Sequence, residues 1–224
     1  MKIVLAALLA ACSLPALAGD AAPRIKPLGA DATVEGTSFA DLTAQWWRWA
    51  FDLPVEPWLE RDGDHCDQGQ SGPVWFLAGT DGRFEPRREC SMPEGKHVLL
   101  PVINMIYYGA NEMADCAQLK RSVRQNNDRL SSAVVLIDGV PVPDVERFRV
   151  ATATCFRWDE GKPISGTNMA ASDGFWLLLP PLPAGRHTIT VGANYGPSDA
   201  PYAGMRQNFE YVLHVGARSR VLGL

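Results

Sequence analysis

Residues 174–196 read GFWLLLPPLPAGRHTITVGANYG, two apolar runs separated by prolines and a glycine. Runs of this length bounded by Pro and Gly are typical of β-strands joined by a turn, so the stretch predicts a β-hairpin. Further strands are expected at 74–78, 96–108 (broken at Pro101), 132–137, 147–158 and 207–215. Many short strands and only two helices favour antiparallel β-sheets arranged as a β-sandwich or jelly roll with two accessory helices, α+β by content.

The first expected helix carries the sequence AQWWRWAF, residues 44–51. It should begin after Ser38, which forms a capping-box-like pair with Asp41, and end near Leu53 before a proline. Phe39, Leu42, Trp46, Trp49 and Leu53 form one apolar stripe, and Thr43, Trp47 and Phe51 form a second beside it. We therefore expect this helix to cover the outer face of a sheet that carries Trp75 or Trp176, with Trp47 on the flank. The second helix is expected over residues 111–128.

The N-terminal segment 1–18 has the anatomy of a secretory signal peptide. One lysine precedes an apolar run, and Ala16-Leu17-Ala18 forms an A-x-A-like cleavage site. A second interpretation stays open, because Leu9 to Cys12 fits the lipobox at which bacterial lipoproteins are cleaved and acylated. We expect an exported, periplasmic or extracellular protein, or alternatively a lipoprotein anchored at Cys12.

After the signal peptide, residues 19–33 are expected to form a flexible leader, 34–216 a single β-rich domain and 217–224 a tail. The whole chain carries 21 basic and 25 acidic side chains with no block of Lys or Arg, which argues against nucleic acid as a partner. No segment after the signal peptide is apolar for long enough to predict a transmembrane span.

Four of the five cysteines follow the signal peptide. An even number in an exported chain predicts disulfides, and we favour Cys66–Cys90 and Cys116–Cys155 among three connectivities because each closes a moderate loop. Zinc is the competing interpretation, but the spacing lacks a C-x-x-C pair. We therefore predict no metal site and no cofactor.

Catalytic patterns are weak. The loop around Gln70 and Ser71 resembles the nucleophile loop of trypsin-like proteases, but it lacks that loop's Asp and doubled Gly, so a turn is expected. Asp62, Asp64 and Asp67 could bind calcium, yet a solvated acidic loop is the simpler expectation. Among many carboxylates, Asp64 and Glu112 are the ones we would substitute first to test for an enzyme.

Aromatic residues are the best functional signal, with seven tryptophans in the chain. Aromatic rings stack on sugar faces, and binding residues concentrate in loops. Trp58 and the pair Tyr107-Tyr108 are expected in loops and are therefore candidate ligand contacts, together with Trp47, Asp64 and Gln70.

Several motifs together resemble a group of exported microbial proteins of unknown activity. They are the Trp-rich N-terminal helix, the GQ-x-GPVWFLAG block at 69–79, the Gly95-Lys96…Leu100-Pro101 stretch and the late PL-P-x-G-x-H segment. The resemblance implies a secreted β-rich fold and no catalytic residues.

We therefore expect a non-catalytic exported protein that binds a carbohydrate or another envelope component through loop aromatics. One alternative is a secreted hydrolase or lyase acting on polysaccharide or peptidoglycan. The other is an envelope structural or partner-binding lipoprotein.

Overall fold

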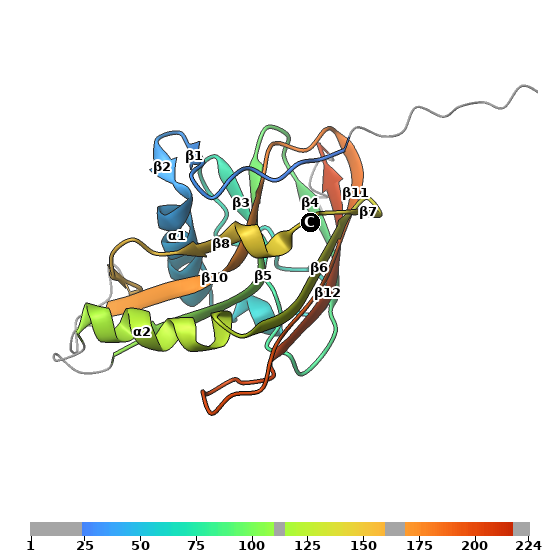
Figure 1. Ribbon diagram of the computed structural model, residues 1–224. Helices are drawn as coiled ribbons and strands as arrows, with labels where there is room; N and C mark the ends of the chain where they lie inside the picture. The colour runs from blue at the N-terminus through green and yellow to red at the C-terminus, as the bar shows by residue number, and fades with distance from the viewer. Residues whose placement is uncertain (1–23, 110–114, 160–168, 217–224) are drawn as a thin grey trace, which may run out of the picture.

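The computed structural model describes residues 24–109, 115–159 and 169–216, drawn in colour in Figure 1. Within these residues two five-stranded sheets pack face to face, beside a two-stranded ribbon of β1 (Thr33–Val34) and β2 (Thr37–Ser38). The central sheet contains β3 (Val74–Phe76), β5 (His97–Tyr108), β10 (Met169–Leu179) and β8 (Arg149–Ala151), with β9 (Phe156–Arg157) also paired with β10. The outer sheet has the order β4 (Arg87–Met92), β12 (Arg206–Val215), β11 (Gly185–Tyr195), β6 (Leu130–Ile137) and β7 (Val140–Pro141).

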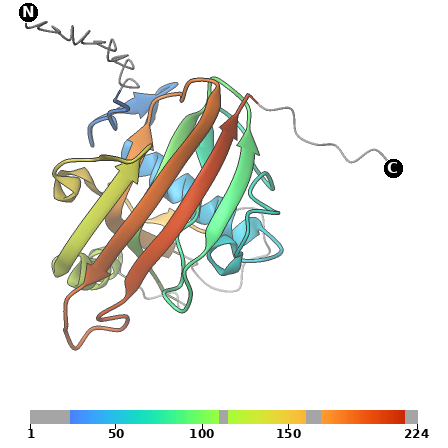
Figure 2. The ribbon, with the colours of Figure 1, turned by 90° about the vertical axis from the view of Figure 1, so that its right-hand side faces the viewer.

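The main core lies between the two sheets. Leu100, Leu177 and Phe175 of the central sheet are buried in the same apolar cluster as Ile189 and Leu213 of the outer sheet. Figure 2 shows the outer face of the outer sheet, which no described helix covers. The predicted mainly-β sandwich with two helices is confirmed.

Helix α1 (Phe39–Asp52) covers the far face of the central sheet, giving a helix–sheet–sheet order of layers (Figure 1). It begins as predicted, because the Ser38 side chain accepts a hydrogen bond from the Asp41 N–H. Trp46 packs edge-on against Trp176 with ring centroids 5.4 Å apart, so of the two predicted contacts Trp176 is the one that the helix covers. Trp75 lies instead in the core between the sheets.

The predicted hairpin at 174–196 is wrong. Its first run is part of β10 and its second is β11, but β10 belongs to the central sheet and β11 to the outer sheet. The Pro-rich connection therefore passes from one sheet to the other. Apolar runs and turn residues are the same for a hairpin and for such a crossing, because only the partner strands differ.

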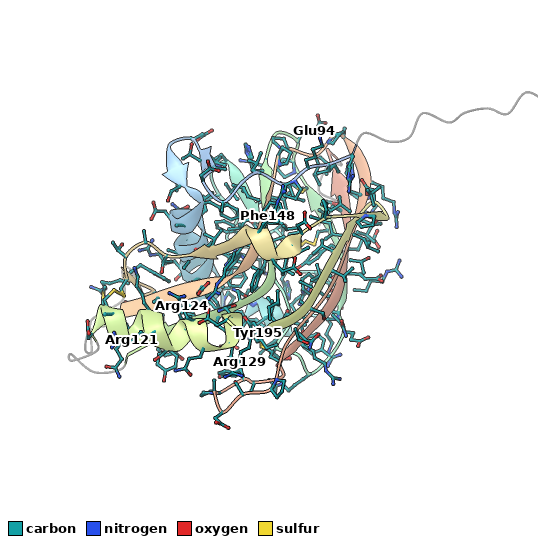
Figure 3. The ribbon with its side chains drawn as sticks, in the orientation of Figure 1. Glu94, Arg121, Arg124, Arg129, Phe148 and Tyr195 are labelled. Atoms are coloured by element: carbon teal, nitrogen blue, oxygen red, sulfur yellow. A yellow bond between two sulfur atoms is a disulfide. The ribbon has the colours of Figure 1, made fainter. Side chains whose placement is uncertain are left out.

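The expected strand 147–158 is also wrong in detail. A 3-10 helix η2 (Val145–Phe148) comes first, and β8 and β9 are separated by residues 152–155. Phe148, labelled in Figure 3, packs between the sheets, whereas Val150 and Phe156 pack under α1. Their side chains thus do not share one face.

Two features of the sheets differ from the expectations. The strand at 96–108 is not broken at Pro101, because β5 continues through it with a register shift that places Pro101 and Ile103 opposite adjacent residues of β10. The sheets are not wholly antiparallel either, since β3 pairs with β5 and β4 pairs with β12 in parallel.

Strand β4 was missed because an arginine points inward. Arg88 is 1% exposed, and its guanidinium donates to the carbonyl oxygens of Ala78, Gly79 and Glu60. It also forms an ion pair with the Glu60 carboxylate at 3.1 Å. A buried arginine is stable only when its donors are matched in this way.

Helix α2 (Cys116–Asn127) packs on the distal ends of β5 and β10, on the side opposite α1 (Figure 1). Residues 111–114 of the expected helix, including Glu112, lie outside the described residues.

The phenol of Tyr195, from β11, donates to Asn127 Oδ1 at 2.6 Å, and Figure 3 shows Tyr195 beside the C-terminal end of α2. Next to it the buried Asp173 accepts two hydrogen bonds from Arg149, and this bonding raises the pKa of the Arg149 guanidinium.

Both predicted disulfides are present, Cys66–Cys90 with Cα atoms 6.1 Å apart and Cys116–Cys155 with Cα atoms 5.8 Å apart. The described part of the expected leader is packed rather than free. Ile25 contacts the main core, and the Leu28 N–H donates to the Leu178 carbonyl at 2.8 Å.

Candidate functional site

A groove lies where β5 emerges from beneath α1, with a volume of about 320 Å³. We call it the aromatic groove. Its walls come from α1, the 3-10 helix η1 (Pro57–Leu59), the turn at 79–81, the distal half of β5 and residues 202–207. Its residues are Trp46, Trp47, Phe51, Glu56, Trp58, Gly79, Thr80, Asp81, Asn104, Met105, Ile106, Tyr108, Tyr202, Met205 and Gln207.

Aromatic rings connect this groove with the protein interior. Trp58 packs against Trp47 and Phe51 at centroid distances of 5.9 and 5.8 Å, and Phe51 contacts Tyr108 at 6.2 Å. Tyr108 is 49% exposed and Tyr202 is 68% exposed, so these two are the most exposed rings of the groove. Trp47 is only 7% exposed, and its indole N–H donates to Ser172 Oγ at 2.8 Å.

Polar side chains also line the groove beside these rings. Asn104 lies on the β5 side, and its buried Nδ2 has no hydrogen-bond partner in the described protein. Glu56 is exposed at the α1 side, and Asp81 accepts from Arg83 Nε at 2.5 Å. Asn104 can approach β10 this closely because residue 174 opposite it is glycine, where a Cβ would lie 2.4 Å from the Asn104 Cβ.

Three of the six candidate ligand residues meet in the groove, namely Trp47, Trp58 and Tyr108. The expectation that Trp58, Tyr107 and Tyr108 lie in loops is wrong, because Trp58 belongs to η1 and both tyrosines to β5. Tyr107 is 44% exposed but lies one residue along the strand, and so points to the opposite face of the sheet.

Gln70 lies away from the groove and forms hydrogen bonds with the protein backbone. Its amide accepts from the Phe76 N–H at 2.9 Å and donates to the Phe76 and Cys66 carbonyls. It therefore satisfies the outward backbone groups of β3, an edge strand of the central sheet.

Asp64 is exposed in the loop that Cys66 joins to β4, and it does not line the groove. Among the described residues no group of three His, Cys, Asp or Glu side chains could hold a metal ion. Burial lowers the pKa of His97, and His187 is bonded to Asp138 at 2.7 Å. His214 Nε2 lies 2.7 Å from Glu89 Oε1 of β4.

Glu56, Asn104, Tyr202 and Met205 are among the groove residues that the sequence did not mark as candidates. Asn104 could have been noticed as a lone amide within the apolar run VINMI. The others come from turns whose position depends on the whole fold.

Comparisons with known proteins add no function. No family model matches the chain, and no curated protein matches it. The solution structure of amebosin aligns over 65% of this chain and 99% of its own length, with 14% identity and a TM-score of 0.23, which is too low to carry an argument. In the part of the chain that the structure describes, no helix has the length and apolarity needed to cross a membrane.

Proposed function

We propose that the protein is a non-catalytic binding protein and that its ligand lies in the aromatic groove. The observation that carries this is the meeting in one concave site of two exposed rings, Tyr108 and Tyr202, with Asn104 Nδ2, which has no hydrogen-bond partner in the described part of the chain. Concave sites with apolar walls and a few polar groups are where small ligands and chain segments usually bind. The two disulfides support export, because such bonds persist in oxidising compartments.

Taken by themselves, the aromatic residues of the groove favour carbohydrate as the ligand class. A tyrosine ring stacks on the apolar face of a sugar, while the Asn104 amide and the Glu56 carboxylate can bond its hydroxyl groups. The Trp47 and Trp58 rings are less suited to stacking on a ligand than the sequence suggested, because each packs against other rings of the cluster.

The test compares two neighbouring tyrosines of similar exposure. A glycan array and a peptide array are probed with the wild-type protein, Tyr108→Ala and Tyr107→Ala. We expect Tyr108→Ala to weaken binding by about tenfold, since an aromatic contact is worth about 0.5–1.5 kcal/mol beyond the area it buries. Tyr107→Ala should bind as the wild type does, because it faces away. Equal binding by all three proteins, or no binding by the folded wild type, would contradict the proposal.

A secreted hydrolase is the second candidate, because two carboxylates, Glu56 and Asp81, line the same groove. Glycoside hydrolysis requires such a pair. This alternative predicts release of reducing ends from a polysaccharide and loss of that release in Glu56→Gln. Binding without any release of reducing ends would favour the non-catalytic function.

A further inference from the structure

Among the described residues, none pairs with the backbone edge of β5 where it runs along the aromatic groove. At its start the His97 N–H donates to Pro73 and the Leu99 carbonyl accepts from Leu77, so these residues face β3. Beyond the register shift, the Gly109 N–H donates to Met169 at 3.2 Å, so the odd-numbered residues now face β10. Because the direction of backbone groups alternates, residues 104, 106 and 108 face the opposite way.

No described strand pairs with β5 on that side beyond Leu99. The backbone N–H and C=O groups of Asn104, Ile106 and Tyr108 therefore open into the groove that these residues line. They present donors and acceptors at every second residue, over about 14 Å of strand at roughly 3.4 Å per residue.

The edge is open because the chain after β3 is drawn away from it. The Tyr211 hydroxyl lies 3.0 Å from both the N–H and the carbonyl of Ala78. The Gln207 amide bonds the N–H and carbonyl of Thr80 at 2.8 and 2.6 Å. Gln207 and Tyr211, both on β12, thereby hold residues 78–80 toward the outer sheet. On the side of β5, the Leu77 carbonyl would next accept from residue 101, which is a proline, and it accepts instead from the Trp46 indole N–H at 2.7 Å.

Nearer the start of β5, the same edge is protected from pairing with another strand by features that are common in edge strands. Pro101 has no N–H to offer, and the register shift beside it interrupts the ladder. This protection stops before Asn104, whose buried Nδ2 has no hydrogen-bond partner among the residues that the structure describes. Unprotected edges pair readily with another extended chain.

We propose that an extended segment of a partner polypeptide adds to β5 as a further strand at residues 104–108. This rests on the proposed function, because it names the ligand of the same groove. Alternate side chains of the segment would contact the cluster of Trp58, Phe51 and Tyr108, so aromatic or β-branched residues suit those positions. A polypeptide fits this site better than a sugar, because it supplies an N–H and a C=O at the repeat of the strand edge.

The probe is an arrayed library of nine-residue peptides with Val, Ile, Phe or Tyr at alternate positions and Thr, Ser or Lys between them. The best binder is then resynthesised with one backbone N-methyl group at each position in turn. We expect at least tenfold weaker binding at every second position, where the N–H faces β5. The intervening positions should stay within about threefold. Losses without this period of two would overturn the inference.

A substitution in β5 tests the proposed strand addition independently of the peptide series. Ile106→Pro removes the central donor of the edge, and a proline there leaves the ladder with β10 intact because residue 106 faces away from it. We expect at least tenfold weaker peptide binding, with thermal unfolding as the check of folding and Tyr107→Ala as the control. If Ile106→Pro does not fold, the N-methyl series still decides.

Other outcomes separate this inference from the function on which it rests. Glycan binding that depends on Tyr108, with no peptide binding, would overturn the strand proposal and keep the groove as the site. Self-association of the wild-type protein through β5, detected by light scattering and lost in Ile106→Pro, would overturn it as well. No binding of either library would remove the proposed function itself.

Discussion

Replacing Tyr211 by phenylalanine tests the contact that directs the chain away from β5. The Tyr211 hydroxyl accepts a hydrogen bond from the Ala78 N–H at 3.0 Å and from Arg88 Nη1 at 3.1 Å, and it lies 3.0 Å from the Ala78 carbonyl. Tyr211 is 2% exposed and Ala78 is 3% exposed, so water does not reach the groups that the substitution leaves behind. The ring remains, so no large cavity forms.

The expected cost follows from which groups lose every partner. The Ala78 carbonyl keeps a hydrogen bond from Arg88, but the Ala78 N–H has no other acceptor among the described contacts. A buried N–H that is left unsatisfied costs about 1–3 kcal/mol. We expect Tyr211→Phe to lower the free energy of unfolding by about 1–3 kcal/mol, a large part of the stability of a typical domain.

The assay is equilibrium unfolding in urea with the disulfides intact, followed by tryptophan fluorescence and circular dichroism. The control is Tyr202→Phe, which removes the same hydroxyl from a ring that is 68% exposed and should change stability by less than about 0.5 kcal/mol. A loss below about 0.5 kcal/mol for Tyr211→Phe as well would refute the reasoning that this hydroxyl holds residue 78.

Three further changes have defined outcomes. Burial raises the pKa values of Tyr195 and Tyr211, so near pH 10 only the unfolded chain releases the protons of these two phenols. The free energy of unfolding, measured by urea unfolding at a series of pH values, should therefore fall as the pH rises above about 10, and it should fall less steeply in Tyr211→Phe. Asp173→Ala leaves the half-buried Arg149 without its buried partner and should cost about 2 kcal/mol, seen as a fall in the melting temperature of about 4–8 °C. Trp46→Phe loses the hydrogen bond from its indole to a buried carbonyl and part of its packing, and should cost about 1–3 kcal/mol in urea unfolding.

Local patterns in the sequence predicted the parts of the fold that local physics determines. The cap at Ser38, the apolar stripes of α1 and the strand at 207–215 depend on neighbours within a few residues, and all three are confirmed. The disulfides follow from the even number of cysteines after the signal peptide, and their pairing follows from loop length.

The predictions of secondary structure that were wrong concern segments whose contacts lie far away in the sequence. β4 was invisible because Arg88 occupies an inward position that normally holds an apolar residue, and its acceptors lie in segments around residues 57–60 and 78–79. The stretch at 174–196 was assigned to one sheet because its composition does not say which strands pair with it. The expectation that Tyr107 and Tyr108 lie in a loop conflicts with the expected strand at 96–108, and the strand is the correct one, because β5 runs to Tyr108.

The groove depends most on residues distant in sequence. Aromatic composition indicated three of its residues, but their position beside an open strand edge results from Tyr211 and Gln207, which lie more than 120 residues from the turn that they hold. Gly79 permits this, because a Cβ there would lie 2.5 Å from Gln207 Oε1. The strand edge is thus exposed by buried hydrogen bonds that keep the neighbouring chain apart from it. A substitution that weakens those bonds should change binding in the groove even though it touches no groove aromatic.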